Sequence, residues 1–212
     1  MIFRPASSRG VVVHPQQLIT SYRSFSCMSY HDPHYMNWGP LRTINDDRAE
    51  PGFSTPWHPH YNLDILGYVI SGTVHHVDNL GNDVTANPGQ VQHMWCGSEI
   101  QHSEANDSSE TNRYLQIWIK PESGADPNPY YELVDRDPYY APLPMAFKNT
   151  HIQVSGGLLR DSIQLTNSYL LVLEGSCNIG HLRLKEGDSV EIDDARIINP
   201  ELLSHILVFS TI

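Results

Sequence analysis

Short strand-like segments divided by turns are the feature of this sequence that most constrains its fold. Between His58 and Glu104, turn sequences such as Ser71-Gly72 and Asn87-Pro88-Gly89 recur at short intervals and leave no room for a crossover helix. Fifteen prolines and fourteen glycines supply such turns along the whole chain, and no long amphipathic helical pattern occurs. The sequence therefore predicts an all-β protein of meanders or Greek keys. In this half, strands are expected at residues 63–70, 74–77, 90–95 and 112–119.

Two motifs at the ends of this stretch are candidate metal ligands. His58 and His60 open it, separated by one residue, and His102 and Glu104 close it with the same spacing. Residues i and i+2 of a strand point to the same side, so each motif presents two side chains on one face. If the two ends meet, three imidazoles and one carboxylate converge. That set suits iron, nickel, copper, manganese or zinc, with positions left open for a substrate, whereas calcium and magnesium prefer oxygen ligands.

A proline-rich stretch divides the chain. Residues 121–145 contain six prolines and are predicted to form a linker, because such a segment can be neither a helix nor a central strand. Residues 1–120 are predicted to form the metal-binding domain, with an extended N-terminal arm over residues 1–20. Residues 146–212 are predicted to form a second domain. Its β segments are expected at 151–156, 169–173, 177–184 and 189–192.

The second half repeats the first in outline. The segment around Gly175 parallels that around Gly72, and the segment around Gly187 parallels that around Gly89. In the first half, the four candidate ligands lie at fixed distances along the chain from Gly72 or Gly89. The same distances from Gly175 and Gly187 lead to Asp161, Ile163, Pro200 and Leu202. No His/Glu set lies nearby, so the second domain is predicted to keep the scaffold without the metal ligands.

Charge and cysteine content narrow the function classes. The net charge is −11, which argues against direct binding to nucleic acid or to an anionic membrane. Three widely scattered cysteines, Cys27, Cys96 and Cys177, predict neither a disulfide framework nor a zinc ribbon. No apolar run approaches the roughly 18 residues of a membrane span, and no secretory signal is recognisable. We therefore expect a soluble, cytoplasmic monomer.

Several other polar residues are given structural interpretations. With twelve histidines in the chain, His75, His76 and His93 are interpreted as chance occurrences. His31 and His34 flank a proline, which suits a turn, and they are assigned a structural or surface role.

Four more residues have alternatives on the sequence alone. Asp46 and Asp47 are interpreted as a polar turn, because a hard-cation site needs further alternating oxygen ligands. Cys96 is interpreted as a small buried hydrophobe rather than a redox-active thiol. Tyr68 could line the pocket or belong to the core.

Together these segments resemble the pirin family of bicupin proteins, which includes bacterial members similar to quercetin 2,3-dioxygenase. The resemblance covers roughly residues 20–120, and the last third is similar only in cupin outline. The pieces that carry it are Ser24-Phe25-Ser26, Gly39-Pro40-Leu41-Arg42-Thr43-Ile44-Asn45-Asp46-Asp47-Arg48, His58-Pro59-His60, Tyr68-Val69-Ile70-Ser71-Gly72, Asp78-Asn79-Leu80-Gly81-Asn82, Pro88-Gly89-Gln90-Val91-Gln92, His102-Ser103-Glu104 and Gln116-Ile117-Trp118-Ile119.

The resemblance implies two cupin (jelly-roll) β-barrels packed face to face, with one mononuclear metal in the N-terminal barrel. The family's ligands correspond to His58, His60, His102 and Glu104, and its usual metal is Fe(II). Some members cleave the heterocycle of the flavonol quercetin with O2. Eukaryotic pirin is instead a nuclear, redox-responsive transcriptional co-regulator.

Three functions are compatible with these features. The first is a metal-dependent dioxygenase of a small aromatic enol and O2, in which Glu104 takes the substrate proton. The second is a redox-responsive regulator that binds a protein partner, and the third is a non-oxidative isomerase. The chain departs from the family pattern at Tyr61, Asp64 and Glu99, and an acid at Glu99 could change substrate access.

Overall fold

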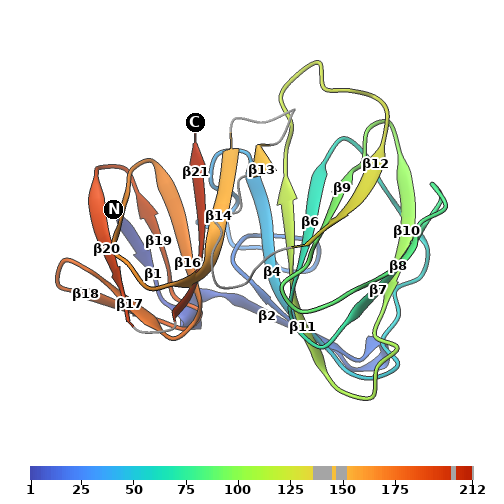
Figure 1. Ribbon diagram of the computed structural model, residues 1–212, viewed down its shortest axis with the longest axis horizontal. Helices are drawn as coiled ribbons and strands as arrows, with labels where there is room; N and C mark the ends of the chain where they lie inside the picture. Colours follow the sequence, from blue (N-terminus) through green and yellow to red (C-terminus); the bar gives the residue numbers. More distant parts are fainter. Residues whose placement is uncertain (136–144, 147–151, 202–203, 212) are drawn as a thin grey trace. The chain divides into compact units, whose positions relative to one another are not determined.

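The structure is a computed structural model that describes residues 1–135, 145–146, 152–201 and 204–211 (Figure 1). The chain divides into two compact units, Arg9–Arg136 and Met1–Ser8 together with Asp137–Ile212. Strands make up almost all regular structure in both units, and the described helices are two short 3-10 turns, Ala6–Ser8 and Pro15–Gln17. The predicted all-β class is confirmed. Among the residues described, no helix has the length and apolar character needed to cross a membrane.

The Arg9–Arg136 unit consists of two antiparallel sheets. One has seven strands in the order β12-β9-β6-β11-β4-β3-β2, and the other has four in the order β5-β10-β7-β8. The strands expected at 63–70, 74–77, 90–95 and 112–119 correspond to β6, β7, β9 and β11. The strand bounds are β2 Gly10–His14, β3 Ile19–Arg23, β4 Leu41–Ala49, β5 His58–His60, β6 Asp64–Ser71, β7 Val74–Asp78, β8 Asp83–Ala86, β9 Val91–Trp95, β10 Ile100–Ala105, β11 Asn112–Ile119 and β12 Tyr130–Val134.

The other unit has the same plan. Its larger sheet has the order β1-β19-β16-β21-β14-β13, and its smaller sheet has the order β15-β20-β17-β18. The β segment expected at 177–184 consists of the two strands of a hairpin, which turns at Gly180, where φ is +59°. The bounds are β1 Ile2–Arg4, β13 Met145–Ala146, β14 Ile152–Leu159, β15 Ile163–Leu165, β16 Ser168–Glu174, β17 Ser176–Ile179, β18 Leu182–Lys185, β19 Ser189–Ile192, β20 Arg196–Pro200 and β21 Ser204–Thr211. Residue 151 lies outside the described residues.

The glycines that indicated the repeat occupy equivalent turns. Gly72 follows β6 with φ +68°, and Gly175 follows β16 with φ +78°. A Cβ atom at Gly72 would lie 2.9 Å from the Cα atom of Asn112, and one at Gly175 would lie 3.0 Å from the Cα atom of Ser204. Both turns therefore require glycine for its backbone conformation and for close approach to a neighbouring strand. The predicted internal repeat is confirmed in strand order and in turn chemistry.

Strand pairing corrects the residues that the repeat assigned to the second half. β5 pairs with β10 so that His58 lies opposite His102, and β15 pairs with β20 so that Ile163 lies opposite Ile198. The equivalent positions are shifted by two residues, because the turns at 166–167 and 193–195 and the adjoining strands β16 and β19 are each one residue shorter than their counterparts. The residues that stand in place of His58, His60, His102 and Glu104 are Ile163, Leu165, Ile198 and Pro200.

Two segments differ from the predicted domain boundaries. The start of the N-terminal arm forms β1, which pairs with β19 in the Asp137–Ile212 unit, while β2 and β3 extend the sheet that contains β4. Tyr130–Val134, predicted to lie in the linker, is the edge strand β12 paired with β9. This strand can pair because residues 130–134 contain no proline. Residues 136–144 of the predicted linker lie outside the described residues.

Candidate metal centre

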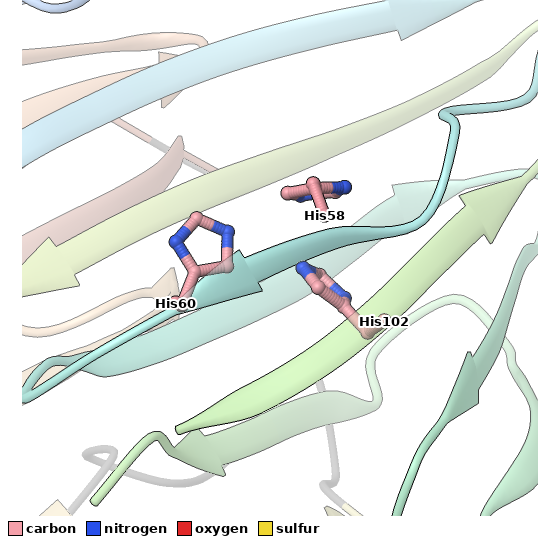
Figure 2. Close-up of side chains that lie close together, drawn as sticks. All are labelled: His58, His60 and His102. Carbon is pink, nitrogen blue, oxygen red and sulfur yellow. The ribbon is translucent and has the colours of Figure 1, made fainter. Parts of the chain in front are cut away.

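Three predicted histidines converge where β5 meets β10. The pairing of these strands places His58 opposite His102 and His60 opposite Ile100. The ring centroids of His58 and His102 are 4.4 Å apart, those of His58 and His60 are 4.9 Å apart, and those of His60 and His102 are 5.2 Å apart. Figure 2 shows the three rings close together, two carried by β5 and one by β10. One nitrogen from each ring lies within 4.8 Å of the other two, a spacing that one metal ion could bridge.

Glu104 lies near His102 and also near His76, which the sequence analysis interpreted as a chance occurrence. Glu104 lies opposite His76 in the pairing of β10 with β7. Ligand atoms of His76, His102 and Glu104 all lie within 4.8 Å of one another. The predicted residues therefore fall into two groups that share His102, and Glu104 is grouped with His76 rather than with His58 and His60. The Glu104 Oε2 atom accepts a hydrogen bond of 2.7 Å from Gln116 Nε2, which fixes the carboxylate.

Two of these histidines, His60 and His102, are held in the neutral form that binds metals. Burial, reinforced by the neighbouring His58, lowers the pKa of His60 to about 4. Burial, reinforced by His58, His60 and His76, lowers the pKa of His102 to about 2. The Nδ1 atom of His58 lies 2.8 Å from the carbonyl oxygen of Pro56, so the ring can donate there and leave Nε2 available. Because metal ligands must be deprotonated, the rings of His60 and His102 are ready to bind a metal ion at neutral pH.

His102 provides the clearest indication that a cation fits here. Its side chain is 1% exposed, and neither ring nitrogen has a hydrogen-bond partner among the described residues. A buried polar atom without a partner costs about 1–3 kcal/mol. A divalent ion would remove that cost for one of the two nitrogens by accepting its lone pair. The donor set of three imidazoles and one carboxylate is also the chemistry that such an ion selects.

The Glu104 carboxyl group titrates near neutrality in the absence of a metal. Burial raises its pKa to about 7, the hydrogen bond from Gln116 opposes the rise, and the nearby Asp47 adds to it. The side chain is therefore poised between a charged and a neutral form. It could act as a metal ligand or exchange a proton with a bound substrate.

His76 is the residue that sequence reasoning missed. It is 2% exposed, and its Nε2 atom lies 3.1 Å from Asp78 Oδ2. Its ring stacks on Tyr131 at 4.3 Å and lies 5.2 Å from the ring of His102. A carboxylate behind an imidazole is the usual support of a histidine in a metal site. The available signal was the spacing of His76 and Asp78, two residues apart and thus on one face of β7.

The other two histidines interpreted as chance occurrences do not join these groups. His75 places its two ring nitrogens 2.6 Å from Asp107 and 2.8 Å from Asp83. His93 lies between Glu132 at 3.0 Å and Asp64 at 2.9 Å. His34 lies 3.1 Å from Asp32 in an exposed turn, as expected, whereas His31 lines a pocket beside the metal candidate.

The polar turn predicted at Asp46 and Asp47 is wrong, because both residues are buried within β4. Asp46 accepts two hydrogen bonds of 2.9 Å from Arg113, which allows the carboxylate to be buried as part of an ion pair. Burial raises the pKa of Asp47 to about 7 despite Arg23 and Ser21. Asp47 is thus a second carboxyl group near Glu104 that titrates around neutral pH.

Cys96 has the buried role that was expected. It is fully buried in a cluster with Ile65, Met94 and Ile100, and burial raises its pKa to about 12, so it remains a thiol. Tyr68 is also buried and belongs to the core.

The three departures from the family pattern have separate surroundings. Tyr61 is exposed and hydrogen-bonds Glu99. Asp64 is buried against His93. Glu99 is half-buried and accepts a hydrogen bond from Gln101.

Comparison with known proteins identifies the family. The family model described as Pirin matches residues 4–119, more than half of the chain. The chain belongs to the pirin family. A pirin-like protein of Caulobacter vibrioides is 36% identical over 196 residues, which cover 82% of this chain and 83% of the relative. A quercetin 2,3-dioxygenase of Escherichia coli K12 is 42% identical over 130 residues, which cover 61% of this chain and 55% of that enzyme.

Solved pirin structures match the fold along the whole chain. YhhW from Escherichia coli superposes with a TM-score of 0.89 at 30% identity, covering 100% of this chain and 97% of YhhW. A second structure, described as bacterial pirin YhhW in complex with nickel(II), superposes with a TM-score of 0.88 at 29% identity, covering 99% and 98%. The predicted cupin fold is therefore confirmed, and a divalent metal is bound in a structure of this relative.

Proposed function

We propose that this pirin-family protein is a metal-dependent dioxygenase of flavonol-like enols, with one Fe(II) ion held by His58, His60, His102 and Glu104. In this proposal the Asp137–Ile212 unit is a structural barrel without ligands. Ni, Cu, Mn or Zn could occupy the same donor set. The observation that carries the proposal is the buried His102, whose two ring nitrogens have no partner within the described residues and which belongs to both ligand groups.

The side chains of the site suit an acidic substrate hydroxyl. With a divalent ion bound, the site gains a Lewis acid for a substrate oxygen and, in the case of iron, redox chemistry with O2. Glu104 is deprotonated when it binds a divalent ion, and as a carboxylate that leaves the ion it could accept the hydroxyl proton as the substrate binds. Gln116 holds the carboxylate through Oε2 and leaves Oε1 for this exchange. His60 and His102, whose pKa values are lowered by burial, cannot compete for the proton at neutral pH.

The relatives support the chemistry at the level of reaction class. Proteins named quercetin 2,3-dioxygenase or putative quercetin 2,3-dioxygenase, from Escherichia coli and Pasteurella multocida, are 39–42% identical to this chain over 121–130 residues. The nickel-bound relative supports a divalent ion in this fold.

The test combines metal loading with turnover. The full-length protein is loaded with Fe(II) without oxygen, its metal content is measured, and oxygen uptake and quercetin loss are then followed in air. His60→Ala is the site variant and His34→Ala the matched control, because His34 is exposed and lies outside both groups. We expect about one iron per chain and turnover in the wild type and control, and loss of both in His60→Ala.

The other outcomes would favour a different function or refute the metal centre. Bound metal without oxygen uptake would favour the redox-responsive regulator, whose protein partner should then be captured only in one metal state. Conversion of an enolisable substrate without oxygen would favour the isomerase. Absence of metal from the wild-type protein after loading would refute the proposed centre.

A further inference from the structure

A pocket of about 400 Å³ lies beside the metal candidate within the Arg9–Arg136 unit. One side is formed by the segment that precedes β4, which includes Met28 and Met36. The other side is formed by strand residues and by the turn after β5. The lining residues are Ser26, Cys27, Met28, Tyr30, His31, Met36, Arg42, Thr43, Leu63 and Trp118.

Trp118 connects this pocket to the histidine cluster. Its ring centroid lies 5.1 Å from that of His60, with the two planes at 72°, and the same side chain lines the pocket. Thr43, its cross-strand neighbour on β4, lines the pocket too, and Leu63 follows His60 by three residues. A molecule against the pocket face of Trp118 is therefore one aromatic ring away from a candidate metal ligand.

The pocket has a charge opposite to that of the whole chain. The chain has 24 acidic and 13 basic residues, yet none of the ten lining residues is Asp or Glu. Arg42 contributes a guanidinium group, and His31 contributes an imidazole. Arg42 Nη1 donates one hydrogen bond of 2.8 Å to the carbonyl oxygen of Met36, and a guanidinium group carries five N–H donors. Most of its donors can therefore serve an anionic oxygen.

The remaining lining surface suits a flat apolar ring. Trp118 and Tyr30 provide aromatic faces, and Leu63, Met28 and Met36 provide flexible or branched apolar surface. Met28 is 84% exposed, so an unbranched thioether lies at the rim, where it can adapt to a ligand. Pockets with apolar walls and a few convergent polar groups are the usual form of small-molecule sites.

We propose that this pocket binds a flat aromatic molecule with an anionic oxygen, which Arg42 selects while Trp118 positions the ring beside His60. Arg42 is then a specificity-determining residue and Trp118 a positioning residue. This inference deepens the proposed function by naming the side chains that recognise the substrate, and it rests on that function only where it treats the ligand as a substrate.

Binding can be tested separately from turnover with two ligands of the same shape. Naphthalene-2-carboxylate carries an anionic oxygen, and naphthalene-2-carboxamide is its neutral counterpart. Both are titrated by fluorescence against the full-length protein, metal-free and Zn(II)-loaded, in the absence of oxygen. We expect the wild type to bind the carboxylate about tenfold more tightly than the amide, because a charge-assisted pair is stronger than a neutral hydrogen bond.

Variants assign that preference to named side chains. Arg42→Gln should weaken carboxylate binding about tenfold and leave amide binding within about twofold, and Arg42→Lys should retain part of the preference. Trp118→Leu should weaken both ligands. Arg183→Gln is the matched control, because this arginine belongs to the other unit and pairs with Glu201 on its surface. Metal stoichiometry should remain at the wild-type value in all Arg variants.

The outcomes separate this inference from the proposed function. Equal affinity for the two ligands, or an unchanged preference in Arg42→Gln, would overturn anion selection, and absence of saturable binding would overturn the pocket itself. If quercetin is turned over and Arg42→Gln leaves its KM unchanged, this inference fails alone. If quercetin is not turned over but the carboxylate preference depends on Arg42, the dioxygenase fails and the pocket stands.

Discussion

The two barrels share one strand order, but one has polar side chains in its interior where the other has apolar ones. In the Arg9–Arg136 unit, the neighbouring strands β5, β10 and β7 of the small sheet carry four histidines and one carboxylate at these positions, namely His58, His60, His102, His76 and Glu104. In the other unit the same register positions carry apolar residues or proline. The equivalent pairs are His58 and Ile163, His60 and Leu165, His102 and Ile198, Glu104 and Pro200, and His76 and Cys177. The fold therefore does not require the polar residues, and their presence in one barrel indicates a function.

The difference also appears in how each interior packs. Among the described residues of the second barrel is a buried apolar cluster that includes Cys177, Leu184 and Ile198. The first barrel also buries polar groups, such as His102, whose ring nitrogens have no partner among the described residues, and the carboxyls of Glu104 and Asp47, whose pKa values are raised by burial. Buried polar atoms that lack partners destabilise a fold. The first barrel should thus be the less stable one until a metal ion binds.

Replacing metal ligands of the first barrel with the residues found at the equivalent positions of the second should have the largest effect on metal binding. In a His60→Leu/His102→Ile double variant, two candidate ligands become the residues found at the equivalent positions. Removal of ligands should weaken metal binding by more than the roughly 10–100-fold caused by changes around a metal site. Oxygen-dependent turnover should be lost with it. Competition titration with a chromophoric chelator measures the affinity.

The same variant should be more stable than the wild type when both are metal-free. Replacing the unpartnered His102 with an apolar side chain removes a penalty of about 1–3 kcal/mol. Urea unfolding with and without metal distinguishes the two effects, because metal should stabilise only the wild type. Wild-type metal affinity in the variant would show that the ion binds elsewhere.

Glu104 should make the stability of the metal-free protein depend on pH. Its pKa is raised from 4.5 to about 7, so the folded state holds the proton more tightly than the unfolded state. This contribution is fully present below about pH 4.5 and is lost as the pH rises through about 7. The change amounts to about 3 kcal/mol, at 1.36 kcal/mol for each pKa unit.

The measurement is the difference in unfolding free energy between the wild type and Glu104→Gln across this range. The difference should shift against the wild type as the pH rises, whereas Glu110→Gln, an exposed acid, should follow the wild-type profile. A constant difference between pH 4.5 and 8 would mean that burial does not control this carboxyl group.

His76 tests whether the distinction between the barrels extends beyond the predicted ligands. His76→Phe keeps a ring to stack on Tyr131 but removes the nitrogen atoms and the contact with Asp78. We expect metal affinity to fall about 10–100-fold, and we expect the absorption spectrum of the Co(II)-loaded protein to shift. His75→Gln is the neighbouring control, because His75 contacts Asp107 and Asp83 instead. If His76→Phe left the Co(II) spectrum and the metal affinity unchanged, His76 would only pack against its neighbours and would not support the metal site.

The sequence predicted the scaffold well because its signals are local. Positive-φ glycines and turn prolines mark the hairpins, and the HxH and HxE spacings follow directly from the period of a strand. His76 was missed because its importance depends on the pairing of β7 with β10, which no local pattern contains. Asp46 and Asp47 were misread for a similar reason, since Arg113 on another strand is what allows Asp46 to be buried. The edge strand β12 was missed because nearby prolines concealed a short segment without any.

The smallest effect concerns the histidine next to His76. His75 faces the surface, and its hydrogen bond to Asp83 is the main cause of a raised pKa, with Asp107 adding to it and partial burial opposing it. Any stability it provides is present below the ordinary pKa of histidine and is lost as the pH rises through the raised value. An NMR titration should place the His75 pKa above 6.5, and Asp83→Asn should lower it. Metal affinity should not change. If Asp83→Asn altered metal binding, the outer face of β7, which carries His75, would influence the metal site. Function could then not be assigned to the inner face of β7 alone.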